Sequence, residues 1–93
     1  PKPGEGPSKE ERENGHYDIV FIGEWPDGQR LHYSVKGRYD PGYGSTSRML
    51  AETGIALLTS DAEGGVGTPG AFLGEALVER LREHAALTFA VEE

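Results

Sequence analysis

The chain contains no cysteine among its 93 residues. This absence excludes disulfide bonds, thiolate nucleophiles and cysteine-based metal sites, and it fits a reducing compartment, so we expect a cytoplasmic protein. Long apolar runs are also missing, since none approaches the roughly 20 residues that a membrane-spanning helix needs. No signal peptide opens the sequence, which begins with Pro and not with Met. We therefore expect no membrane partner, and we expect a piece cut from inside a longer protein.

Basic residues are scarce as well. Nine Lys and Arg stand against 16 Asp and Glu, which gives a formal net charge of −7. Binding to a nucleic-acid backbone is driven mainly by clustered Lys and Arg, and here these residues are scattered. We therefore expect no nucleic-acid partner. The length suits one domain with a single modest core.

The first 15 residues form an arm followed by a short helix. Residues 1–7 hold three prolines and two glycines, which predicts an extended arm. Ser8 and Glu11 have the spacing of a capping box, in which each side chain bonds to the backbone N–H of the other, and Gly15 stops the helix. Residues 16–93 then constitute a single α+β domain.

A β-hairpin follows the short helix. Residues 17–24 are β-branched and aromatic on both faces, so we expect both faces of this strand to be covered. Residues 26–28, Pro-Asp-Gly, are typical of a tight turn in which glycine takes the left-handed position. Residues 30–36 alternate apolar with polar side chains and predict a half-exposed second strand.

Two helices and a final strand complete the chain. The first helix runs from Ser45 to about Leu58, because its apolar or small positions follow helical spacing. Those positions are 46, 49, 50, 53, 54, 57 and 58. Residues 87–91 alternate again and predict the last strand. The fold class is therefore α+β, with a small, largely antiparallel sheet and two main helices on one of its faces.

The second main helix has a clear beginning. Thr68 is a good N-cap, and Pro69 suits the first helical position. Gly70 and Gly74 lie on the apolar stripe of this helix. Because each glycine costs about 1 kcal/mol of helix propensity, we expect close packing against a neighbouring element to explain them.

Two glycine-rich loops, residues 40–47 and 64–70, each lead directly into a helix. Helix N-termini present unpaired N–H groups and can hold anions, although such loops can equally be simple turns and caps. Gly42, Gly44 and Ser47 only partly match the dinucleotide-binding fingerprint, because Ser stands at its third position and no strand follows at the required distance. The three histidines are far apart in the sequence. We therefore assign no catalytic, metal-binding or cofactor-binding residue in this chain.

The first of these loops is the candidate site. Arg38, Tyr39, Asp40 and Tyr43 lie between a strand end and a helix start, where binding residues often collect, and Thr46 follows in the helix. An arginine here could clamp a substrate carboxylate through two parallel hydrogen bonds. The alternative is a surface contact between Arg38 and Asp40 beside two half-buried tyrosines.

Three separated groups of motifs give the chain a family resemblance. They are Pro3–Ser8, Asp40–Gly44, and Gly64–Val66 followed by Thr68-Pro69, continued by Gly74–Leu77 and Leu87–Phe89. In these motifs the chain resembles the C-terminal end of bacterial saccharopine dehydrogenase-like oxidoreductases, often called trans-acting enoyl reductases. It departs from them at Gly67, where a bulkier apolar residue is usual, and at Gly70, where Ala is typical.

The resemblance implies a longer parent enzyme. Its N-terminal Rossmann domain would bind NAD(P), so no cofactor is expected in this fragment. A second domain with a mixed sheet would cover the active site and form a homodimer, and the present chain would be the last part of that domain. The fragment would supply substrate-pocket and dimer surfaces without being active alone. The alternative is a free-standing α+β ligand-binding or oligomerisation module.

Overall fold

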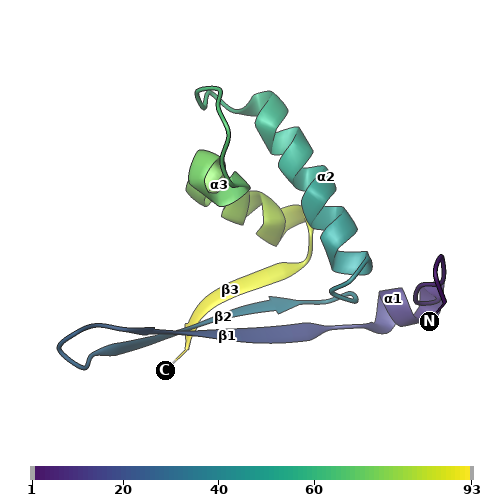
Figure 1. Ribbon diagram of the computed structural model, residues 1–93, viewed down its shortest axis with the longest axis horizontal. Helices are drawn as coiled ribbons and strands as arrows, with labels where there is room; N and C mark the ends of the chain where they lie inside the picture. The colour runs from purple at the N-terminus through teal and green to yellow at the C-terminus, as the bar shows by residue number, and fades with distance from the viewer. Residues whose placement is uncertain (1, 93) are drawn as a thin grey trace.

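The structure is a computed structural model that describes residues 2–92, so Pro1 of the predicted arm lies outside it. The elements follow the order α1 (Lys9–Asn14), β1 (Tyr17–Glu24), β2 (Arg30–Gly37), α2 (Gly44–Thr59), α3 (Pro69–His84) and β3 (Leu87–Glu92). The three strands form one antiparallel sheet in the order β1-β2-β3. Figure 1 shows α2 and α3 on one side of this sheet. The predicted α+β class is confirmed.

Helix α1 begins as its capping box predicts. The Ser8 hydroxyl accepts the N–H of Glu11 at 3.1 Å, and the Glu11 carboxylate accepts the N–H of Ser8 at 2.9 Å. None of its residues is buried, because the helix is polar on all sides. Within the preceding arm, the N–H of Glu5 donates to the carbonyl of Lys2 and closes a turn.

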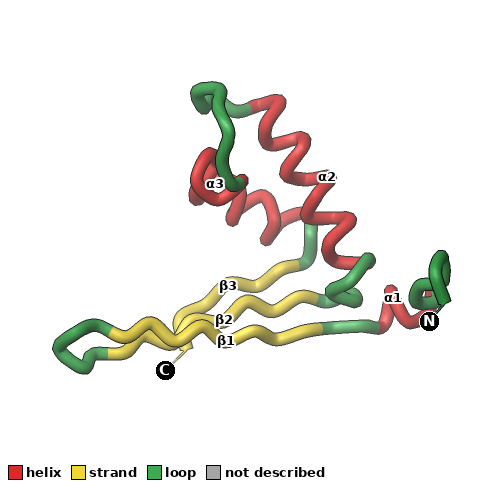
Figure 2. The backbone as a smooth tube through the Cα atoms, in the orientation of Figure 1, coloured by secondary structure: helices red, strands yellow, loops and turns green. Residues whose placement is uncertain are grey.

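The β1–β2 hairpin reaches beyond the rest of the sheet. Its turn is the predicted one, with Gly28 at φ 90° and its N–H donating to the Trp25 carbonyl at 2.9 Å. β1 pairs with all of β2, whereas β3 pairs only with residues 32–37 of β2. The far half of the hairpin therefore extends away from both long helices (Figure 2).

Helix α3 confirms its predicted cap but not the predicted role of its glycines. The Thr68 hydroxyl accepts the N–H of Ala71 at 3.3 Å, and Pro69 opens the helix. A Cβ built at Gly70 or Gly74 would meet no atom within 4 Å, so the expectation of close packing is wrong. Gly74 has φ 52° and ψ −135° and kinks the helix, a conformation that other residues rarely adopt.

Gly67, just before α3, has a different explanation. A Cβ at this position would lie 2.7 Å from the ring of Phe72. The aromatic ring occupies the space that a larger side chain at position 67 would need. Glycine at this position and Phe72 in the following helix are therefore a matched pair.

The core lies between α3 and one end of the sheet. Its buried apolar residues are Ala56, Leu73, Leu77, Leu81, Ala85 and Leu87. Helix α2 contributes little to it, because Leu50 and Leu58 among its predicted apolar positions are 73% and 87% exposed. A partly buried ion pair between Glu52 and Arg80, 2.7 Å apart, joins α2 to α3 instead.

Much apolar surface stays open. The accessible surface is 7076 Å², whereas a compact monomer of this mass exposes about 5,200 Å². The radius of gyration is 15.8 Å, against about 12 Å for a compact chain of this length. Residues 19–22 of β1 are exposed on both faces, because the helices cover only the near end of one face. We expected both faces of β1 to be covered, but within this chain neither face is covered at residues 19–22.

Candidate functional site

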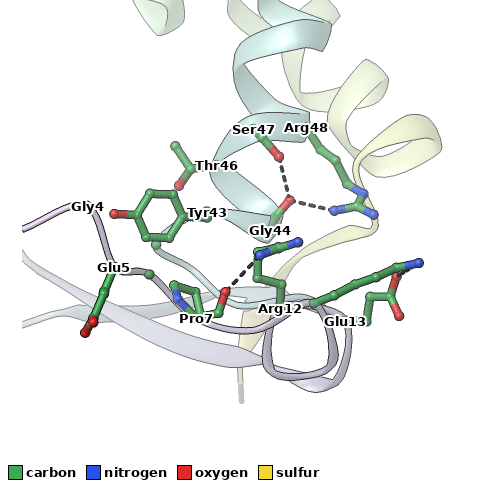
Figure 3. A pocket seen from close by; sticks show the side chains of 13 residues that line it. Gly4, Glu5, Pro7, Arg12, Glu13, Tyr43, Gly44, Thr46, Ser47 and Arg48 are labelled. Carbon is green, nitrogen blue, oxygen red and sulfur yellow. Dashed lines mark hydrogen bonds and ion pairs between the residues drawn. The ribbon is translucent and has the colours of Figure 1, made fainter. Parts of the chain in front are cut away.

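A pocket of about 780 Å³ lies at the start of α2. Its walls come from arm residues 4–7, from one side of α1, and from residues 42–44 and 46–48 of the loop and α2. Figure 3 shows these segments facing one another across the pocket. Residues more than 30 positions apart in the sequence thus meet at one place.

Asp40 caps the beginning of α2. Its carboxylate accepts three backbone N–H groups, from Gly42 at 2.9 Å, Tyr43 at 3.0 Å and Gly44 at 2.6 Å. The bond from Gly44 does most to hold the pKa of Asp40 below its ordinary value, and the nearby charge of Arg12 adds to this lowering. The chain's own carboxylate therefore fills the anion-binding end of α2. For this loop, the turn-and-cap alternative describes the geometry.

Two glycines let α1 lie directly against the Asp40 loop. The N–H of Asp40 donates to the carbonyl of Arg12 at 3.0 Å. A Cβ at Gly15 would lie 2.7 Å from the backbone N and Cα atoms of Asp40, and a Cβ at Gly44 would lie 3.0 Å from the Arg12 carbonyl oxygen. Any side chain at position 15 would separate the backbones and break this contact.

A partly buried hydrogen bond joins the sheet to α2 at the same junction. The Tyr17 hydroxyl and the Ser45 hydroxyl are 2.7 Å apart, and Ser45 is fully buried. The Tyr17 ring crosses over Gly37, where a Cβ would collide with it. Glycine at position 37 therefore provides the path by which Tyr17 reaches α2.

The structure separates the five predicted site residues. Tyr43 and Thr46 line the pocket. Asp40 serves as the cap, and the ring of Tyr39 lies 3.6 Å from the Arg48 guanidinium that stacks on it. Arg38 is exposed and is not part of the pocket wall. The cation whose charge acts on Asp40 is Arg12 and not Arg38.

Sequence reasoning missed the basic residues of the pocket. Lys9, Arg12 and Arg48 all line it. An Arg12 N–H donates to the Pro7 carbonyl at 2.8 Å, and an Arg48 N–H donates to the Gly44 carbonyl at 2.7 Å. Lys9 and Arg12 belong to α1, and the polar sequence of this short helix predicts only an exposed surface element. The only available signal was that cations are few in this acidic chain.

A second, smaller cavity of about 520 Å³ lies between the end of α2 and α3. Its wall includes Ser60, Asp61, Phe72 and Arg80. The second glycine-rich loop, residues 64–70, lines neither cavity. Within residues 2–92, no group of three or more His, Asp or Glu side chains could hold a metal ion. No helix in the same range is long and apolar enough to cross a membrane.

The chain is similar to mycobacterial proteins along most of its length. It is 44% identical, over 86 residues, to a protein of Mycobacterium tuberculosis strain H37Rv that is provisionally named a trans-acting enoyl reductase. It is 38% identical over 94 residues to the trans-acting enoyl reductase of Mycobacterium ulcerans, and 40% identical over 85 residues to that of Mycobacterium bovis strain BCG. These alignments cover 87%, 97% and 87% of the chain.

The chain spans only about a fifth of the length of the curated relatives that it matches, namely 20%, 22% and 20% in the three cases above. No protein-family model and no solved structure matches it.

Proposed function

We propose that the chain is the C-terminal part of an enoyl-reductase-type oxidoreductase, which uses NAD(P) and belongs to the saccharopine dehydrogenase-like group. The chain supplies substrate-pocket and dimer surfaces and is not active alone. The observation that carries this proposal is 44% identity over 87% of the chain to a relative five times as long as the matched segment. We assign the enoyl-reductase activity to the proposed parent on the basis of the names of its relatives.

The open apolar surface supports a larger folding unit. Ile19, Phe21, Leu31 and Val91 share one sheet face through the strand register, and all are exposed. This face continues the one that packs on the core near Val35 and Phe89. A sheet face is stabilised only when a second layer covers it. In the proposed parent, the remainder of the enzyme or a second copy provides that layer.

The free edge of β1 supports the same conclusion. Within the described residues 2–92, β1 pairs only with β2, so the outer backbone groups of its eight residues have no strand of this range beside them. Exposed edge strands are usually protected by Lys, Pro or a bulge. Between Asp18 and Glu24, β1 has none of these and carries apolar side chains on both faces. We propose that a further strand pairs here in the assembled protein.

The cofactor is assigned to the remainder of the parent. The loop that most resembles a nucleotide fingerprint is closed by the Asp40 carboxylate. A pyrophosphate at the same N–H groups would have to displace this carboxylate and would be repelled by it. We therefore place NAD(P) in an N-terminal Rossmann domain outside this chain, with a homodimer as the assembled form.

Two measurements test the proposal. An antibody against the chain should detect a native polypeptide of ~40 kDa or more in extract from its source. That polypeptide should bind NADPH saturably in calorimetry, whereas the 93-residue chain alone should not. A native band near 10 kDa, or micromolar NADPH binding by the chain alone, would contradict it.

A free-standing binding module is the second candidate function. One observation favours it: the pocket at the start of α2 is built entirely from residues 4–48 of this chain. A ligand could therefore be bound without another domain. The same antibody experiment separates the two candidates, because a free-standing module has the size of the chain itself.

A further inference from the structure

The pocket at the start of α2 holds more basic than acidic residues, although the protein as a whole is acidic. The chain has a net charge of −7 and nine basic residues, yet Lys9, Arg12 and Arg48 line this one pocket. Lys9 is paired with Glu13 at 3.8 Å on the same side of α1. The two arginines come from different elements, α1 and α2, and only the tertiary fold brings them to the same wall.

Both guanidinium groups are held in place by the backbone. Arg12 donates to the Pro7 carbonyl, and Arg48 donates to the Gly44 carbonyl while stacking on the Tyr39 ring. Each is half-buried. A guanidinium has five N–H donors in a planar fork, so one carbonyl contact leaves donors for a bidentate acceptor. Arginines fixed in this way lose little conformational entropy when a ligand binds.

The nearby carboxylates are engaged elsewhere. Asp40 accepts three backbone N–H groups, and Glu13 faces Lys9. Glu5 accepts the N–H of Lys2 at 3.0 Å, and in Figure 3 its side chain points away from Arg12 and Arg48. Three basic and two acidic residues therefore line the pocket, which leaves a small excess of positive charge at its wall. Asp40, outside the wall, offsets part of the charge of Arg12.

The pocket is larger than a simple ion requires. Its volume of about 780 Å³ is within the range of small organic ligands. The Tyr43 ring forms an apolar wall beside the arm, where a Cβ at Gly6 would lie 3.6 Å from it. We propose that this pocket binds an organic anion, whose carboxylate or phosphate group bonds to Arg12 and Arg48 and whose carbon skeleton lies against Tyr43. The proposal concerns this chain alone and does not depend on the enzyme assignment.

Titration calorimetry on the native protein, at the length found in its source, tests the proposal. The probes are butyrate, its neutral and nearly isosteric amide butyramide, butyl phosphate and inorganic phosphate. We expect saturable binding of butyrate or butyl phosphate and at least tenfold weaker binding of butyramide. The tighter of the two anions identifies the ligand group as carboxylate or phosphate. The proposal would be overturned if neither butyrate nor butyl phosphate bound saturably, or if butyramide bound as tightly as the tighter of the two anions.

Variants locate the bound anion. Arg12→Gln and Arg48→Gln should each weaken anion binding at least tenfold. Arg30→Gln is the matched control, because this arginine lies in the far half of the hairpin, paired with Glu24 at 3.0 Å, and its replacement should leave binding unchanged. Unchanged binding in both pocket variants would place the anion elsewhere and refute the proposal.

A measurement on the unmodified protein removes any dependence on the folding of the variants. Nuclear magnetic resonance of the native protein should show that the tighter anion shifts the backbone amide signals of Gly44 and Ser47, and that butyramide does not. Anion-induced shifts confined to residues outside the pocket would refute the assignment even if both variants failed to fold.

Discussion

The two ends of the sheet differ in how far they are covered by other parts of the chain. At the near end, α1 and the Asp40 loop meet at Gly15 and Gly44, and Tyr17 passes over Gly37. A Cβ would collide with its neighbours at positions 15 and 37 and would be tightly packed at position 44. The partly buried Tyr17–Ser45 hydrogen bond joins β1 to α2 at the same junction. At the far end, Phe21, Leu31 and Val91 lie on one sheet face through the strand register and are exposed.

This difference shows which part of the molecule is self-sufficient. At the junction, the backbone N–H groups of Asp40, Gly42, Tyr43 and Gly44 all have acceptors within the chain itself. The far end has side chains suited to burial but no layer to bury them. The chain therefore has a pocket walled by its own residues and an apolar sheet surface without a covering layer, the pattern expected of one part of a larger unit.

The largest expected effect is a difference in the free energy of unfolding between substitutions in the core and at the far end of the sheet. Leu77→Ala should lower the free energy of unfolding by about 2–5 kcal/mol, because it leaves a cavity between α3 and the sheet. Leu31→Ala in the 93-residue chain should cost at most about 1 kcal/mol, the range of strand propensity alone, because this side chain is exposed there. Urea unfolding of both variants measures the difference. Equal losses would show that the far end is already packed within this chain.

The same Leu31→Ala substitution sharpens the comparison in the full-length native protein. If another layer covers the hairpin there, the loss should rise to about 2 kcal/mol or more, as for other buried aliphatic residues. A loss as small as in the isolated chain would mean that this face stays open in the assembled protein.

The next effect concerns the glycines of the junction. Gly15→Ala should destabilise the chain by about 1–3 kcal/mol, because the new methyl group overlaps the backbone of Asp40. Gly70→Ala is the control, since a Cβ there meets no atom within 4 Å and alanine favours helix by up to about 1 kcal/mol. Thermal unfolding monitored by circular dichroism distinguishes them. A stable Gly15→Ala variant would show that α1 is not held against the loop.

A smaller effect is expected at the start of α3. Thr68→Ala should lower stability by about 1 kcal/mol, because the N–H of Ala71 loses its side-chain acceptor. Thr68→Ser keeps the hydroxyl and should behave like the parent sequence in the same urea titration. If both variants match the parent, this hydroxyl does not stabilise the helix.

The smallest effect is the pH dependence contributed by Asp40. Its pKa is lowered in the folded protein, chiefly by the Gly44 N–H, relative to an ordinary value of about 3.9. Its contribution to stability is therefore complete above about pH 3.9 and is lost as the pH falls through the lower folded value. Asp40→Asn should remove this part of the acid dependence, as measured by urea unfolding between pH 6 and pH 2. The effect is modest because solvent screens the group. If the free energy of unfolding falls with acid equally in Asp40→Asn and in the parent sequence, the three N–H bonds do not stabilise the charged form of Asp40.

Local signals in the sequence predicted most of the fold. The capping box at Ser8, the Pro-Asp-Gly turn and the Thr68-Pro69 helix start act over three or four residues, so they are readable without tertiary information. The sequence correctly predicts that Gly74 lies in α3, but the predicted reason for it, close packing, is wrong. Its positive φ follows from a kink that no pattern of apolar spacing reveals.

The candidate site was only half predictable. Tyr43 and Thr46 were found because they lie beside a loop with a clear sequence signature. Arg12 and Arg48 were missed, because their common wall depends on α1 folding back against the Asp40 loop. That contact rests on one backbone hydrogen bond and on two glycines, and neither has a recognisable spacing in the sequence.

The sequence by itself determined the order and type of the elements, their caps and the absence of cysteine chemistry. These features depend on contacts between near neighbours and on composition, which the sequence states directly. The tertiary structure alone decided which apolar faces are buried, which carboxylate fills the start of α2 and which cations meet in the pocket. Such outcomes depend on packing between residues distant in the chain, where small differences in space, set here by single glycines, select one arrangement.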